Sequence, residues 1–196
     1  MKILIACEYS GVMRDAFTKK GHDVMSCDLL PSDKPGKHYQ GDVMDIINDG
    51  WDMLIAHPPC TYMSNSGVCH LHKDPARWVE LFKAGEFFKG FLDADIPKIV
   101  IENPIMHKYG KQLIGNIKQS QVIQPWMHGH AEQKATCLWI KGLPLLTESN
   151  NVKEEMMLLP KNKRQRLHYF PPSPDRWKLR STTYAGIANA MAEQWG

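Results

Sequence analysis

The chain has 196 residues, of which 43% are hydrophobic, and a formal net charge of +3. This length supports one good core but is short for two domains of usual size, so residues 1–196 are expected to form a single domain. The weak positive charge permits contact with nucleic acid but does not demand it. Five scattered cysteines without a CxxC pair argue against a disulfide scaffold, and no apolar stretch approaches the ~20 residues that cross a bilayer. A cytoplasmic protein is therefore expected, with no contact to a membrane.

The first two thirds of the chain predict alternating strands and helices. Apolar runs predict strands, and helical spacing with an N-cap at Asp74-Pro75 predicts a long helix whose aromatic and aliphatic side chains share one buried face. Another helix is expected over 111–118. This alternation favours an α/β fold with a mostly parallel sheet and helices on both faces. The expected strands are 3–7, 23–27, 53–56 and 98–101, and the shared helical face comprises Trp78, Leu81, Phe82, Phe88, Phe91 and Leu92.

Polar residues follow each predicted strand, where parallel sheets place their ligands. Glu8, Asp28, Cys60 and Glu102 are therefore expected to face one crevice. The turn at 7–11 could hold one end of a nucleotide-like cofactor. Asp28 suits the two ribose hydroxyls, although a turn or helix cap is an equal alternative.

Cys60 lies in a loop stiffened by Pro58 and Pro59, which would aim a nucleophile reproducibly. A thiol reacts only as its thiolate, so a functional Cys60 needs a lowered pKa or a base. Glu102 supplies an acid that could relieve charge on a pyrimidine ring attacked at C6. The alternatives are an inert loop cysteine and a strand-end carboxylate bonded to nearby backbone.

Six motifs are spread over nearly the whole chain: Glu8-Tyr9-Ser10-Gly11, Asp28, Gly41-Asp42-Val43, Pro58-Pro59-Cys60, Glu102-Asn103-Pro104 and Ile187-Ala188-Asn189-Ala190-Met191. Taken in this order, they resemble the C5-cytosine methyltransferase family. The resemblance implies a Rossmann-like fold, S-adenosylmethionine as cofactor, Cys60 as the nucleophile that attacks the base, Glu102 as the residue that contacts its N3, and Lys134 as a weaker candidate for steadying the base or a phosphate. The implied cofactor-binding residues are Glu8, Tyr9, Ser10, Gly11, Asp28, Asp42, Val43, Pro58 and Asn189.

The chain departs from that family chiefly in size, because only about 144–180 is available where a larger target-recognition domain is usual. Residues 161–180 hold seven Lys or Arg against one Asp, mixed with aromatics, as in surfaces that bind nucleic-acid strands. A solvated loop is the plainer alternative. The partner is expected to be nucleic acid, DNA in the first instance, and a protein partner or self-association could complete recognition. The candidate contacts are Lys161, Lys163, Arg164, Arg166, Lys178 and Arg180.

Three other functions stay open. C5 methylation of a free pyrimidine nucleotide would explain the short recognition segment. An amino-methyltransferase is suggested by His57-Pro58-Pro59-Cys60, which is similar to the Asp/Asn-Pro-Pro-aromatic loop of such enzymes, although the first and fourth residues differ. A catalytically silent module that binds nucleic acid is the third. The His and Cys residues at 69–72 and 128–130 lack the spacing of zinc sites, so no metal is expected.

Overall fold

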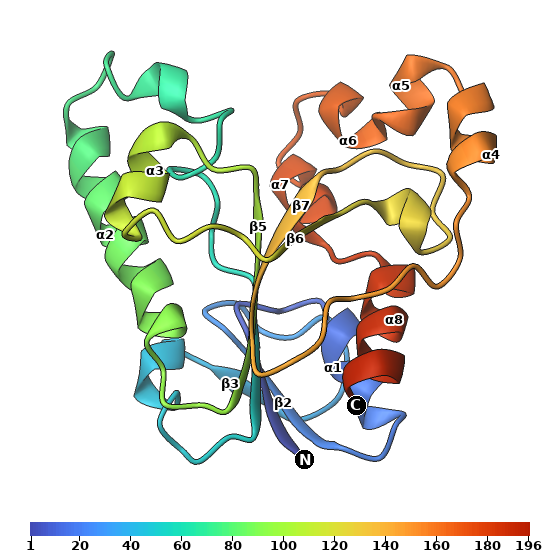
Figure 1. Ribbon diagram of the computed structural model, residues 1–196. Coiled ribbons are helices and arrows are strands. Elements are labelled where there is room, and N and C mark those ends of the chain that lie inside the picture. The colour runs from blue at the N-terminus through green and yellow to red at the C-terminus, as the bar shows by residue number, and fades with distance from the viewer.

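A computed structural model describes residues 1–196, which form one seven-stranded sheet flanked by helices (Figure 1). Across the sheet the strand order is β3-β2-β1-β4-β5-β7-β6. The strands are β1 (Lys2–Ala6), β2 (Asp23–Asp28), β3 (His38–Gln40), β4 (Met53–Ala56), β5 (Lys98–Pro104), β6 (Gln121–Ile123) and β7 (Thr136–Lys141).

The five strands from β3 to β5 run parallel, whereas β7 runs antiparallel to both β5 and β6. The chain moves outward from β1 to β3 and then returns to the other side of β1 with β4. Doubly wound sheets bind their ligands at such a reversal, beyond the carboxyl ends of the strands. The predicted Rossmann-like α/β fold with a mostly parallel sheet is therefore confirmed.

Helices cover both faces of the sheet, as expected: α2 and α3 lie on one face, and α1 and α8 pack together on the other (Figure 1). The α-helices are α1 (Val12–Thr18), α2 (Ala76–Leu92), α3 (Lys108–Leu113), α4 (Lys153–Leu158), α5 (Lys161–Arg164), α6 (Arg166–Tyr169), α7 (Arg176–Ser181) and α8 (Ala185–Trp195), with 3-10 turns at Val43–Asp45, Val68–His70 and Pro125–Met127.

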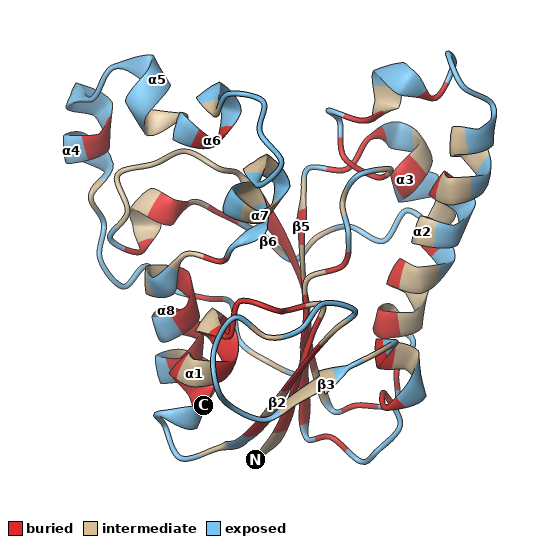
Figure 2. Cartoon of the chain, turned by 180° about the vertical axis from the view of Figure 1, so that it is seen from behind, coloured by how far each residue is buried: buried red, intermediate tan, exposed pale blue.

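The central strands are apolar throughout because both of their faces are covered. Alternate side chains of β1 enter different cores: Leu4 belongs to the cluster that contains Phe88 of α2, and Ile5 to the cluster that contains Met191 of α8. Figure 2 shows the buried residues concentrated in these strands and on the helix faces turned toward them. The two cores hold the strand ends in fixed register.

The long helix α2 begins at Ala76, one residue later than Asp74-Pro75 predicts, and the Asp74 carboxylate accepts a hydrogen bond from the Ala76 amide at 3.0 Å. Leu81, Phe88 and Phe91 are buried, as expected. Phe82 was wrongly assigned to the buried face: it is 56% exposed. The sheet covers a narrower strip of α2 than the apolar face that the sequence predicts, and Phe82 lies outside that strip.

The helix predicted over 111–118 is wrong in its bounds. Helix α3 begins earlier, where the His107 ring caps it by accepting a hydrogen bond from the Gly110 amide at 3.1 Å. It ends earlier because Gly115 and Asn116 adopt positive φ angles of 73° and 57°, which stop a right-handed helix. The short strands β3 and β6, as well as β7, were not predicted.

The segment 144–180, which lacks strong periodicity, contains the four short helices α4 to α7, none longer than six residues. Figure 1 shows α4, α5, α6 and α7 grouped beside β6 and β7, at the end of the sheet away from the chain termini. No helix of the chain combines the length and the hydropathy that a bilayer crossing requires.

Candidate functional site

The turn after β1 is built around the buried carboxylate of Glu8. It accepts hydrogen bonds from the Met13 amide at 2.7 Å, the Arg14 amide at 3.2 Å and the Ser10 hydroxyl at 3.1 Å. Gly11, with φ 69°, is the residue just before α1, and Glu8 accepts from amides in the first turn of that helix and so caps it. Both carboxylate oxygens of Glu8 thus accept hydrogen bonds within the protein, and the contact between Glu8 and Ser10 holds the turn in shape.

Tyr9 of the same turn is 8% exposed because α7 covers it. Its hydroxyl donates to the Lys178 carbonyl at 3.2 Å and lies 3.0 Å from the Ser181 hydroxyl, and its ring centroid is 5.8 Å from that of Trp177. Lys178 in turn forms a 2.7 Å ion pair with Asp33. Helix α7 therefore joins the turn after β1 to the loop after β2.

Two carboxylates lie around the end of β1. Asp28 is half-buried and accepts from the Leu30 amide at 3.0 Å, whereas Asp42 is exposed and accepts from the Met44 amide at 3.0 Å. Burial raises the pKa of Asp28, although the amides of Leu30 and Leu29 oppose that rise. Burial, followed by the charges of Asp28 and Asp42, also raises the pKa of Cys7, so both carboxylates act on the end of β1. Val43, next to Asp42, is buried.

The loop after β2 is held by the buried guanidinium of Arg14, which the sequence did not single out. It pairs with Asp15 at 3.1 Å and donates to the Ser26 and Ser32 hydroxyls at 3.2 and 3.0 Å. It also donates to the carbonyls of Lys34 and Pro35. The rigid guanidinium fork satisfies several acceptors at once and fixes the loop that begins after Asp28.

The Cys60 loop follows β4 and is attached to β5. The buried Asn103 side chain donates to the Pro58 carbonyl at 3.2 Å, and the Cys60 carbonyl accepts from the amides of Met63 and Ser64. The thiol is half-buried. Burial raises its pKa, and the positive charges of Lys134 and Arg180 oppose that rise. The thiolate at this position would therefore lie near two cations.

His57 and Glu102 form a largely buried pair that was not predicted. The register pairs Ala56 of β4 with Ile101 of β5, which brings the next residue of each strand side by side. His57 Nδ1 lies 3.5 Å from Glu102 Oε2, and each side chain is 13% exposed. Burial alone would lower the pKa of His57 and raise the pKa of Glu102, but their mutual contact and opposite charges more than offset it. The pKa of His57 is raised and that of Glu102 is lowered.

Lys134, in the connection between β6 and β7, acts on His57, Cys60 and Glu102 through its charge. Its ammonium donates to the Arg180 carbonyl at 3.3 Å, and its backbone amide donates to the Gln124 side chain at 3.0 Å. Its charge affects the pKa of His57, Cys60 and Glu102 alike. The three residues named as catalytic from the sequence thus lie within electrostatic reach of one another. His57 could have been found from its place before Pro-Pro-Cys at a strand end.

Asn189 forms no hydrogen bond with the residues described above. It is exposed on α8 between the buried Ala188 and Ala190, and its side chain makes no hydrogen bond within the chain. Helix α8 uses its buried side chains to pack against α1. A cofactor contact from Asn189 is an expectation that rests on the sequence alone.

The basic residues of 161–180 do not form one uniform set. Arg166 pairs with Glu132 at 2.9 Å, and Lys178 is engaged with Asp33. Lys161 and Lys163 are exposed and form no ion pair. The other three lie closer to the protein: Arg164 Nη1 is 3.9 Å from the Met157 sulfur, Arg176 donates to the Phe170 carbonyl at 2.8 Å, and the charge of Arg180 opposes the rise in the pKa of Cys60.

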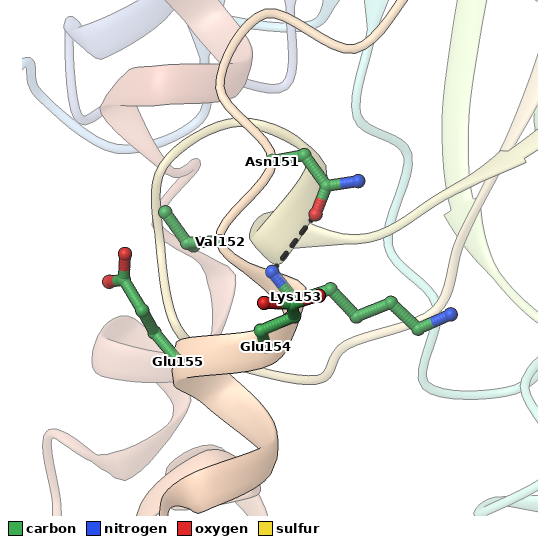
Figure 3. A pocket seen from close by; sticks show the side chains of 5 residues that line it. All are labelled: Asn151, Val152, Lys153, Glu154 and Glu155. Carbon is green, nitrogen blue, oxygen red and sulfur yellow. Dashed lines mark hydrogen bonds between the residues drawn. The ribbon is translucent and has the colours of Figure 1, made fainter.

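The surface also carries a hollow of about 330 Å³ at the start of α4, drawn in Figure 3. It is lined by the consecutive residues 151–155, and the Asn151 side chain accepts from the Lys153 amide at 2.9 Å. None of the strand-end residues contributes to it. No group of three or more His, Cys, Asp or Glu side chains is arranged to hold a metal ion.

No protein-family model and no curated protein sequence matches the chain. Its structure is similar to a proposed DNA modification methyltransferase encoded within an E. coli prophage, with 17% identity and a TM-score of 0.46 over 82% of this chain and 56% of that one. It is also similar to a methyltransferase of Entamoeba histolytica, with 12% identity and a TM-score of 0.48 over 77% and 57% of the two chains.

A third similar structure is a bifunctional kinase-methyltransferase, with 12% identity and a TM-score of 0.42 over 75% of this chain and 36% of that one. The chain thus spans little more than half the length of the first two structures. Similarities of this size do not assign an activity to the chain.

Proposed function

We propose that the protein is a methyltransferase that acts on C5 of cytosine in DNA through a covalent adduct with Cys60. The proposal rests on one observation: the Cys60 loop is bonded to β5 through Asn103, next to Glu102, with Lys134 approaching both groups. A thiol, a carboxylic group and a cation are the side chains that addition to a pyrimidine ring needs.

The residues around the end of β1 suit S-adenosylmethionine as methyl donor. Asp28 and Asp42 each use one carboxylate oxygen for a backbone amide. The second oxygen of Asp28 could accept from ribose hydroxyls, and that of Asp42 from the adenine amine. When bound, the cofactor would supply an electrophilic methyl group. Tyr9, Ser10, Gly11, Val43 and Pro58 would shape its pocket, with Asn189 as an outer contact.

The chain's own residues would then prepare the base. A cytosine must leave its stack to reach a loop of this kind. Lys134 and Arg180 would favour the Cys60 thiolate, which adds to C6, while Glu102 serves N3 and limits the negative charge that accumulates in the ring. After methylation, loss of the C5 proton and departure of Cys60 restore the aromatic ring.

DNA is the proposed partner because Lys161 and Lys163 remain unpaired in a basic segment. Phosphate contacts of this kind give affinity without sequence choice. A second copy or another protein could complete target recognition.

The deciding experiment uses DNA that contains 5-fluorocytosine, whose C5 carries no proton. Addition and methylation can proceed, but elimination stalls, so an adduct that resists denaturation should accumulate only with the methyl donor. Cys60→Ser should abolish the adduct, whereas the matched change at the exposed Cys69, Cys69→Ser, should not. Methyl found on the exocyclic amine would favour the amino-methyltransferase alternative, and adducts formed only with free nucleotide would replace DNA as the substrate.

A further inference from the structure

His57 and Glu102 are two ionisable side chains in a largely buried position, which is unusual for such groups. Both side chains are 13% exposed and close to one another, yet His57 Nε2 and Glu102 Oε2 have no full hydrogen bond within the protein. Buried polar atoms without partners are costly and are concentrated where a ligand or a reaction uses them. The pair is fixed at the ends of two adjacent strands and directly precedes the Cys60 loop.

We propose that His57 and Glu102 form a two-residue proton relay, in which His57 supplies the proton that Glu102 passes to N3 of the target cytosine. The inference rests on the function proposed above and deepens it. Glu102 would touch the base, whereas His57 acts through Glu102 and is a positioning residue.

A relay is needed because of the charge that Glu102 carries. N3 of neutral cytosine is an acceptor, and so is an ionised carboxylate, so an isolated Glu102 carboxylate would repel N3. The contact with His57 holds the pKa of Glu102 low and the pKa of His57 high, so the proton resides on the imidazole. The remaining charged groups that act on His57 are Glu8, which favours its protonated form, and Lys134, which opposes it.

The proposed step balances in protons and electrons. Glu102 first takes the proton from His57, which leaves His57 neutral. The Cys60 thiolate then forms a bond to C6, the electrons of the C5–C6 double bond shift through C4 to N3, and N3 takes that proton from Glu102, which becomes a carboxylate again. The adduct is neutral and carries an electron-rich C5. When Cys60 leaves, the N3 proton returns to His57 by the same route, and the proton lost from C5 passes to solvent.

The relay can be tested without any methyl donor. The neutral adduct can accept a solvent proton at C5 and then lose either hydrogen before Cys60 departs. DNA carrying tritium at cytosine C5 should therefore release tritium to water in the presence of the protein alone. This release reports addition and N3 protonation, and it does not depend on methyl transfer.

His57→Gln is the informative variant, because its amide can still donate to Glu102 but cannot transfer a proton. We expect tritium release to fall by about 100-fold, in line with the loss of general acid catalysis. The limb of the wild-type pH profile that follows His57 should disappear. Adding Glu102→Gln should cause little further loss, because the two residues act as one unit. His57→Asn provides a second variant if the first is poorly folded.

A measurement on the free protein accompanies these rates. The His57 ring should titrate by NMR above its ordinary pKa in the wild type and below it in Glu102→Gln, because burial remains when the opposing charge is removed. Full tritium release by folded His57→Gln, with its pH profile unchanged, would overturn the relay alone. Absence of release by the wild type, or its persistence in Cys60→Ser, would overturn the proposed C5 chemistry and the relay with it.

Discussion

The side-chain amide of Asn103 donates a hydrogen bond to the Pro58 carbonyl at 3.2 Å and so ties the Cys60 loop to the end of β5. We predict that Asn103→Leu, which keeps the volume but removes the donor, lowers the free energy of unfolding by about 1–3 kcal/mol, because a buried carbonyl loses its partner. Urea unfolding measures this loss. In a Cys69→Ser background, iodoacetamide should also alkylate the half-buried Cys60 faster. Unchanged stability and alkylation would show that the loop is held elsewhere.

Arg14 should control the order of the loop after Asp28. Arg14→Lys keeps the charge but loses the planar fork that serves five acceptors, so we expect at least about 2 kcal/mol of destabilisation. Trypsin should then cleave faster at the exposed Lys37. Asp15→Asn removes only one ionic partner of the guanidinium and should have a smaller effect. Equal cleavage of all three proteins would contradict this account.

The His57-Glu102 pair should give stability a defined pH window. The pKa of His57 is raised above its ordinary 6.5, so its contribution is complete below that pH and is lost as pH rises through the folded-state pKa. The pKa of Glu102 is lowered below its ordinary 4.5, so its contribution is complete above that pH and is lost as pH falls through the folded-state pKa.

The difference in unfolding free energy between the wild type and the His57→Gln/Glu102→Gln double variant should therefore be largest between pH 4.5 and pH 6.5. Urea titrations from about pH 3 to pH 9 measure it. A difference that does not vary with pH would mean that the two groups do not form an ion pair in the folded protein.

S-adenosylmethionine should raise the melting temperature, because a ligand that binds only the folded state stabilises it by mass action. Asp28→Asn should weaken binding by roughly 10-fold to 100-fold, as expected for the loss of hydrogen bonds to a charged acceptor. Calorimetry gives the affinity directly. Asp95→Asn removes an exposed carboxylate outside the site and serves as the matched control. Equal affinities for the two variants would remove Asp28 from the proposed pocket.

Lys161 and Lys163 should contribute to DNA affinity more clearly than the basic residues already engaged in ion pairs. Each lost phosphate contact reduces the slope of log affinity against log salt by roughly 0.9. Lys161→Ala/Lys163→Ala should reduce that slope on every sequence. Lys19→Ala/Lys118→Ala makes the same change of charge at exposed positions outside the basic segment, one beyond α1 and one before β6, and should leave the slope unchanged. A reduced slope for Lys19→Ala/Lys118→Ala, with an unchanged slope for Lys161→Ala/Lys163→Ala, would show that DNA binds at another surface.

Much of the sheet follows from the sequence because buried parallel strands are almost wholly apolar, as in β1 and β4. The strands β3 and β6 have three residues each, too few to show any periodicity, and tertiary pairing creates them. Strand β7 does contain an apolar run, Cys137-Leu138-Trp139-Ile140, and it could have been recognised. The bounds of α3 depend on positive φ angles at Gly115 and Asn116, which composition does not specify.

The sequence predicts the candidate site only through one rule, namely that polar residues at the carboxyl ends of parallel strands lie near the ligand. That rule selects Asp28, Cys60 and Glu102, but it says nothing of what each carboxylate contacts. Glu8 lies at such an end and serves as the cap of α1. The His57-Glu102 contact depends on the alignment of β4 with β5, which a one-residue slip would destroy.

Helix α7 contacts the Tyr9 hydroxyl through its backbone and Asp33 through Lys178, while the Arg180 carbonyl receives the Lys134 ammonium. This short helix therefore contacts three loops that are remote in sequence: the turn after β1, the loop after β2 and the connection between β6 and β7. A ligand that displaces α7 must break these bonds, and one that leaves α7 in place preserves them. By thermodynamic reciprocity, occupancy of the basic segment and occupancy of the turn after β1 would then change each other's affinity by the same factor.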